Sequence, residues 1–138
     1  MENSMTSHPV PDSLKIWFVI HFIIDIAFAI PLFLFPEAFL DLFNWHSIDP
    51  LATRLVAAAL FGIGIESLLG RNASAESFRN ILNLKIIWSA TATIGILVSI
   101  IQNTYITPPI EWLLLLTFFS FNLLWGYYRV RIGKILAP

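Results

Sequence analysis

Ionisable and amide side chains interrupt long apolar stretches of this chain, and their types and spacing could do chemistry. Histidine and aspartate take up and release protons, and glutamate and lysine pair as ions. Such groups are costly inside hydrocarbon, where they often mark ligand sites or proton pathways. The candidate ligand or proton site consists of His21, Asp25, Glu66, Lys85 and Asn122.

The first two of these residues are four positions apart, so His21 and Asp25 share one face of a helix. Asp25 lies near the middle of its apolar stretch, and its short side chain reaches neither membrane surface. It must therefore be protonated or paired. The functional interpretation is a site that carries a proton or polarises a ligand. The structural alternative is a network of Asp25 with other polar groups: His21, Lys85, Ser89 or Asn122.

Glu66 and Lys85 lie at matching depths on consecutive antiparallel stretches and carry opposite charges. Pairing offsets part of the cost of burying a charge, so the sequence predicts an ion pair between them. The alternative is that Lys85 extends to the nearby membrane surface. Asn122 is expected to join helices through hydrogen bonds rather than to contact a ligand.

Four apolar stretches must position these residues. The chain has 138 residues, 57% of them hydrophobic and 12% charged, against about a quarter charged in soluble domains. Each stretch has about the 20 residues that cross a bilayer. The predicted fold is all-α, a polytopic membrane protein whose single domain, residues 14–138, is a four-transmembrane-helix bundle. The helices are expected at Leu14–Phe35, Leu51–Gly70, Ile81–Ile101 and Ile110–Tyr128.

Two segments outside these helices also carry predictions. Residues 1–13 are expected to form a mobile polar tail. Pro36 followed by Glu37 is typical of a helix start, and Phe39, Leu42 and Phe43 share one face. The segment from residue 36 to 45 is too short to span, so we expect a short helix in the outer interface.

The basic residues predict the orientation. With an even number of crossings, seven of the eight fall on one side, and only Arg54 falls on the other. Positively charged loops stay in the cytoplasm, so both termini are expected there. The seven are Lys15, Arg71, Arg79, Lys85, Arg129, Arg131 and Lys134.

Arg54, Ala58, Gly62 and Glu66 recur at intervals of four along the second stretch. Ala58 and Gly62 form a small-xxx-small pair, which allows helices to approach closely in lipid. Packing within one chain is the favoured interpretation, and contact between two copies in a homodimer is the alternative. Arg54 is expected to have a structural role near the outer surface, towards Glu37, Asp49 or Glu111.

Composition excludes several classes of function. A net charge of −1 offers no basic surface for nucleic acid. The absence of cysteine excludes disulfides, cysteine nucleophiles and zinc–thiolate sites. Of the three histidines only His21 lies in an apolar stretch, since His8 and His46 fall on opposite sides, so no metal or other cofactor is expected.

One part of the chain resembles a known family. The segment from Leu34 to Phe39, the pair Asp49-Pro50 and the run from Arg54 to Gly64 are similar to small four-helix proteins of the DoxX-like group. The resemblance implies a kinked first helix, an interfacial segment and a second helix with an early arginine and small residues. A few members of that group are linked to quinone-dependent oxidoreductases.

The sequence favours a function without catalysis. The leading hypothesis is a binding or transport module for a small solute, a lipid-like ligand or a proton, using the polar cluster in the cytoplasmic half. The alternative is a structural or redox-accessory, quinone-linked membrane subunit with no catalytic site of its own. The expected partners are the lipid bilayer, a small ligand and a second copy of the chain.

Overall fold

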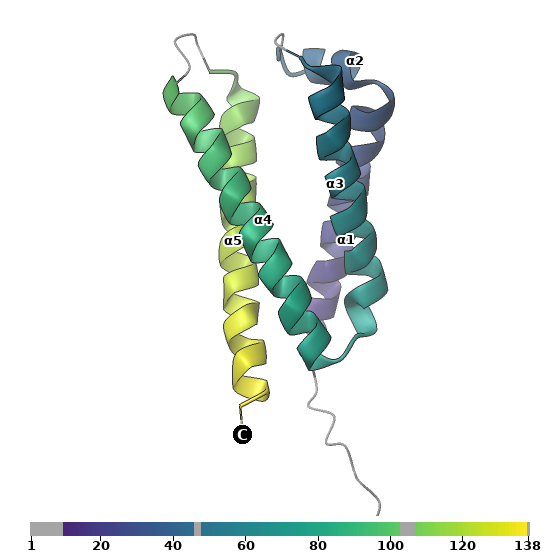
Figure 1. Ribbon diagram of the computed structural model, residues 1–138, viewed down its shortest axis with the longest axis vertical. Coiled ribbons are helices and arrows are strands. Elements are labelled where there is room, and N and C mark those ends of the chain that lie inside the picture. Colours follow the sequence, from purple (N-terminus) through teal and green to yellow (C-terminus); the bar gives the residue numbers. More distant parts are fainter. Residues whose placement is uncertain (1–9, 46–47, 103–106, 138) are drawn as a thin grey trace, which may run out of the picture.

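A computed structural model describes residues 10–45, 48–102 and 107–137. Helices account for nearly all of these residues, and no strand occurs within the three ranges. In chain order the elements are α1 (Asp12–Leu34), α2 (Pro36–Asp41), α3 (Pro50–Leu69), the 3₁₀ helix η1 (Gly70–Asn72), α4 (Ala75–Gln102) and α5 (Pro109–Ile135) (Figure 1). Residues 1–9 of the predicted tail, His46 and residues 103–106 lie outside the described residues.

The predicted fold class is confirmed. Helices α1, α3 with η1, α4 and α5 are each long and apolar enough to cross a membrane, which indicates a multi-pass membrane protein. Only a helix satisfies all of its own backbone hydrogen bonds in lipid, which explains why these apolar stretches are helical. The short α2 follows α1, as predicted.

Several helix ends differ from the predicted ones. Helix α4 begins at Ala75 rather than Ile81, and α5 continues to Ile135 rather than ending at Tyr128. Hydropathy marks only the part of a helix that suits hydrocarbon, whereas the backbone continues through polar and basic residues beyond it. Helix α2 stops at Asp41, and the turn after it reaches Asn44, whose φ is 57°.

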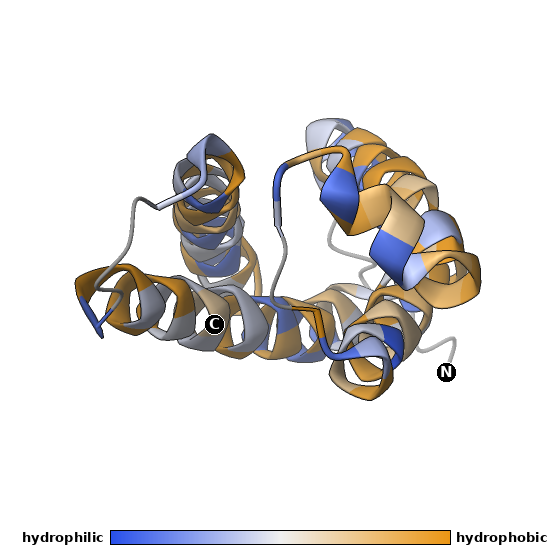
Figure 2. Ribbon diagram, turned by 90° about the horizontal axis from the view of Figure 1, so that it is seen from above, coloured by the Kyte–Doolittle hydropathy of each residue, from blue (hydrophilic) through white to orange (hydrophobic). Residues whose placement is uncertain are grey.

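The long helices form two pairs. Helix α1 packs mainly on α3, and α4 packs mainly on α5. Both pairs come together at the end of the molecule where α1 begins, α5 ends and η1 lies, and they diverge towards α2 (Figure 1). We call these the η1 end and the α2 end. The view from the α2 end shows the two pairs apart and largely apolar residues along all helices (Figure 2).

A cluster of buried apolar side chains joins the two pairs near the η1 end. Its members come from α1, α4 and α5: Leu14, Phe18, Phe78, Leu82, Trp125, Tyr128 and Ile132. Within it, the Phe18 ring meets those of Phe78 and Trp125 edge to face, at centroid distances of 4.8 and 5.8 Å. In lipid, such close packing replaces the hydrophobic effect as the force between helices. This apolar cluster therefore closes the η1 end.

Candidate functional site: a cavity with a buried polar cluster

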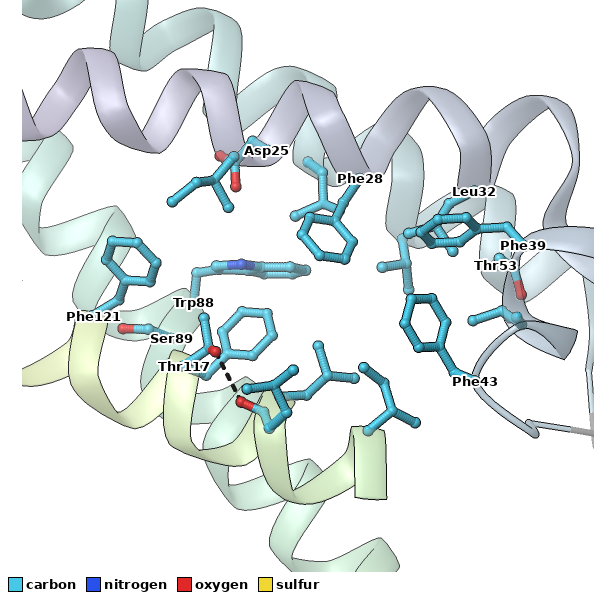
Figure 3. A pocket seen from close by; sticks show the side chains of 18 of the residues that line it. Asp25, Phe28, Leu32, Phe39, Phe43, Thr53, Trp88, Ser89, Thr117 and Phe121 are labelled. Atoms are coloured by element: carbon cyan, nitrogen blue, oxygen red, sulfur yellow. Dashed lines mark hydrogen bonds between the residues drawn. The ribbon is translucent and has the colours of Figure 1, made fainter. Parts of the chain in front are cut away.

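A cavity of about 420 Å³ lies between the two helix pairs, and all five α-helices contribute to its lining. Its size falls within the range of about 300–1,000 Å³ that is typical of small-molecule sites. Asp25, Ser89 and Phe121 lie towards one end of it, and Phe39, Phe43 and Thr53 lie towards the other (Figure 3). The cavity therefore runs from the middle of α1 to the α2 end.

Aromatic and aliphatic side chains form most of the cavity wall. Trp88 lies between the two ends in the close view, with Phe28 on the opposite helix pair (Figure 3). At the α2 end the rings of Phe39 and Phe43 meet edge to face at 5.4 Å, and Phe39 also meets Phe28 at 6.1 Å. These rings give the cavity a long apolar section.

Lys85 is the centre of a polar cluster at the other end of the cavity. Lys85 is only 2% exposed to solvent. Its Nζ donates a hydrogen bond to Ser67 Oγ at 2.6 Å and lies 3.2 Å from His21 Nδ1. The ammonium group also lies 5.0 Å from the ring centroids of Phe18 and Trp125, where each aromatic face attracts a cation. The protein thus holds a buried cation from both helix pairs.

His21 connects this cation to Asp25. Asp25 Oδ2 lies 2.8 Å from His21 Nδ1, a distance typical of a charged contact. Asp25 Oδ2 is buried and accepts no hydrogen bond from the described residues. When Lys85 donates to Nδ1, that nitrogen has no proton to give to Asp25. Asp25 Oδ2 therefore lies beside His21 without a hydrogen-bond donor.

The position of Asp25 depends on a missing side chain in α3. A Cβ added at Gly64 would lie 2.8 Å from Asp25 Cβ, closer than such atoms approach. The buried residues of α3 are Ala57, Gly64 and Ser67, all small, so α1 lies directly against this face. Gly64 thus lets α1 approach at the level of Asp25, and Ser67 supplies an acceptor for Lys85.

Asn122 lies at the edge of the polar cluster. Its Nδ2 donates to the Ile86 carbonyl at 2.9 Å and to Ser89 Oγ at 3.0 Å. Ser89 Oγ in turn donates to the Lys85 carbonyl at 2.7 Å. These bonds link α5 to α4, the role as an interhelical contact that the sequence predicted for Asn122.

The predicted ion pair between Glu66 and Lys85 is wrong. Glu66 is exposed, and no ion pair joins it to Lys85 in the described part of the chain. Matching depth and opposite charge suggested the pair, but Glu66 lies one residue before the buried Ser67, and its carboxylate stays beyond ion-pair distance of Lys85. Lys85 takes Ser67 and His21 as its partners instead.

The residues that recur at intervals of four along α3 form a stripe, Arg54, Ala58, Gly62 and Glu66, that is not the packed face of this helix. Arg54, Ala58 and Gly62 are exposed, and a Cβ at Gly62 would meet nothing within 4 Å. Packing within one chain therefore occurs at Gly64 rather than at the Ala58–Gly62 pair, and a homodimer contact through the stripe stays a prediction. Arg54 Nε donates to the Phe33 carbonyl at 3.2 Å, near the end of α1.

Of the five predicted site residues, the structure gathers His21, Asp25 and Lys85 directly, adds Asn122 through Ser89, and leaves Glu66 out. Sequence reasoning missed Ser67 and Gly64. Gly64 and Ser67 follow Ala57 by seven and ten residues, which marks one face of a helix, but the exposed stripe on α3 also contains small residues.

Within the described ranges, no group of three or more His, Asp or Glu side chains is placed to hold a metal ion. Comparisons of the chain with models of protein families, with curated proteins and with solved structures found no match.

Proposed function

We propose that this protein binds a lipid-like amphipathic ligand in the cavity between its two helix pairs. One observation carries the proposal: an elongated apolar cavity ends at a buried polar cluster of His21, Asp25 and Lys85. An amphipathic molecule has the same division, with an apolar chain and one polar end. Convergent polar groups in a mostly apolar cavity are typical of ligand sites.

The apolar cluster at the η1 end favours binding over transport. Phe18, Trp125 and the other members of that cluster pack between the pairs just beyond the polar groups. A solute that reached Lys85 from the α2 end would meet tightly packed rings there. Release on the opposite side of the membrane would require this packing to open.

The same proposal includes an orientation. We place both termini and η1 on the cytoplasmic side, because Arg71, Arg79 and the basic end of α5 lie at the η1 end. The α2 end of the cavity then faces the outer leaflet. Single cysteines tested with a membrane-impermeant thiol reagent would check this, since the chain has no cysteine of its own. Labelling of an added C-terminal cysteine from outside intact cells would overturn the orientation.

The binding proposal is tested by photolabelling of protein in nanodiscs with two diazirine-bearing probes, hexadecanol and hexadecanoic acid. At least one should label peptides that contain lining residues of α1, α4 or α5. Ala52, which is exposed and lines the cavity near the α2 end, offers a place to block it. We expect Ala52→Trp to reduce cavity labelling several-fold.

Ala58→Trp is the matched control, because Ala58 is exposed on the same helix outside the cavity lining. It should leave labelling unchanged. The proposal fails if neither probe labels lining peptides, or if the two variants reduce labelling equally.

A further inference from the structure

We infer that the ligand of this cavity carries an uncharged hydrogen-bond donor at its polar end, a hydroxyl group, which donates to Asp25. The inference rests on the proposed function, because it names the class of ligand for the same cavity. Three observations lead to it: the hydrogen bonds already made in the polar cluster, the balance of charge around it, and the apolar wall beside it.

Most polar groups of the cluster at the cavity wall already have hydrogen-bond partners. Lys85 is engaged by Ser67 and His21, and Ser89 is engaged by Asn122 and by the Lys85 carbonyl. The Asp25 side chain is only 7% exposed, yet Oδ2 accepts no hydrogen bond. A buried acceptor without a donor is costly, and lipid supplies none. The cluster thus leaves Asp25 Oδ2 without a donor.

Hydroxyl groups elsewhere in the lining cannot fill this role. Thr53 Oγ1 donates to the Asp49 carbonyl at 2.8 Å, and Thr117 Oγ1 donates to the Leu113 carbonyl at 2.8 Å. Asp49 itself caps α3 by accepting from the Leu51 and Ala52 amides. Their bonds are local to their own helices, whereas Asp25 Oδ2 is a buried acceptor in the lining that no described donor reaches.

The charges around the polar cluster favour an uncharged group on the ligand. Lys85 and Asp25 have opposite formal charges and lie on either side of His21, and Glu66 is exposed on α3. A carboxylate ligand would bring a second anion beside Asp25, and an ammonium ligand would bring a second cation near Lys85. Either adds an uncompensated charge in a low-dielectric site. A hydroxyl group donates a hydrogen bond without changing the charge.

The apolar section of the cavity favours a ligand with a long hydrocarbon chain. From Asp25 the cavity continues past Trp88 and Phe28 to Phe39 and Phe43 (Figure 3). This section offers contact to methylene groups and few polar partners. A long-chain alcohol, with its hydroxyl at Asp25 and its chain towards the α2 end, therefore fits the whole length.

Competition on the wild-type protein tests the ligand class directly. The probe is diazirine-bearing hexadecanol, and the competitors are unlabelled hexadecanol, methyl hexadecanoate, hexadecanoate and hexadecylamine. One hydrogen bond to a charged acceptor corresponds to about tenfold or more in affinity. Hexadecanol should therefore displace the probe from lining peptides at concentrations about tenfold below those of the ester, which has no donor. The two ionised competitors should also be weaker than the alcohol.

A double variant tests the assigned acceptor. Asp25→Leu alone would leave the positive charge of the buried Lys85 without a compensating anion. It is therefore combined with Lys85→Met, which keeps the cluster neutral. In this variant, the alcohol and the ester should displace the probe at equal concentrations.

The outcomes separate the two proposals. Equal competition by alcohol and ester in the wild type, or preferred binding of hexadecanoate or hexadecylamine, would overturn the hydroxyl inference and leave the binding function in place. Retained alcohol preference in the double variant would also overturn it. Failure of every amphiphile to label the cavity would instead remove the binding function itself.

Discussion

Single residues decide how the charges in this protein are compensated. The carboxylate, imidazole and ammonium groups of Asp25, His21 and Lys85 meet in one place, and an uncharged Ser67 completes the contacts of the ammonium. The sequence predicted the participation of the three ionisable residues because they are rare inside apolar helices. It could not predict Ser67, since a serine in a membrane helix usually bonds to its own backbone, and Ser67 does that as well, to the Ile63 carbonyl.

Removal of this hydroxyl should destabilise the protein. Ser67→Ala takes away an acceptor 2.6 Å from a buried ammonium, and we expect a loss of about 1–3 kcal/mol in the free energy of unfolding. Thermal unfolding in detergent, followed by circular dichroism, provides the measurement. Ser99→Ala is the control, because Ser99 is exposed, and it should have little effect. Equal effects of the two substitutions would show that Lys85 does not depend on Ser67.

At the scale of elements, the four helices were predictable and their faces were only partly so. Helix α1 has one buried face, Leu14, Phe18, His21, Asp25 and Ala29, and its spacing is evident in the sequence. Helix α3 has small residues on both faces, so periodicity does not decide which one is packed. The resemblance to DoxX-like proteins, which draws on this helix, stays a prediction that no comparison supports.

The two faces of α3 lead to a matched pair of substitutions. Gly64→Ala forces a methyl group to within 2.8 Å of Asp25 Cβ, and separation of α1 from α3 should cost about 1–3 kcal/mol. Gly62→Ala adds the same methyl group where nothing lies within 4 Å, and it should be neutral or slightly stabilising. Unfolding in detergent compares them. If Gly62→Ala were the more damaging one, the packed face would have been assigned incorrectly, or a second copy would cover the stripe.

At the scale of the whole molecule, the two helix pairs are tied together at one end and separated by the cavity at the other. Sequence reasoning did not predict the cavity, because it treated the four helices as one bundle. Divergence of the pairs depends on where large side chains gather. The rings of Phe18, Phe78 and Trp125 meet near the η1 end, a three-dimensional coincidence that no local pattern shows.

This arrangement predicts different freedom of motion at the two ends. Spin labels at Leu55→Cys and Leu116→Cys, both exposed and near the α2 end, should give a broad distance distribution by pulsed electron paramagnetic resonance. Labels at Leu69→Cys and Val130→Cys, exposed near the η1 end, should give a narrow one. The chain has no cysteine that would interfere. Equally narrow distributions would mean that the pairs form one rigid body.

The division of the polar cluster between the pairs has a consequence for biogenesis. His21, Asp25 and Ser67 belong to the helices that leave the ribosome first, whereas Lys85 arrives on the third membrane-spanning helix. The early hairpin of α1 and α3 thus enters the bilayer with Asp25 and the Ser67 acceptor but without the Lys85 ammonium that contacts this site. Docking of the second hairpin, α4 and α5, brings Lys85 to Asp25 and so compensates the buried charge. Assembly of the two hairpins is therefore coupled to charge compensation. A chain truncated after η1 would expose the uncompensated Asp25 to cellular quality control.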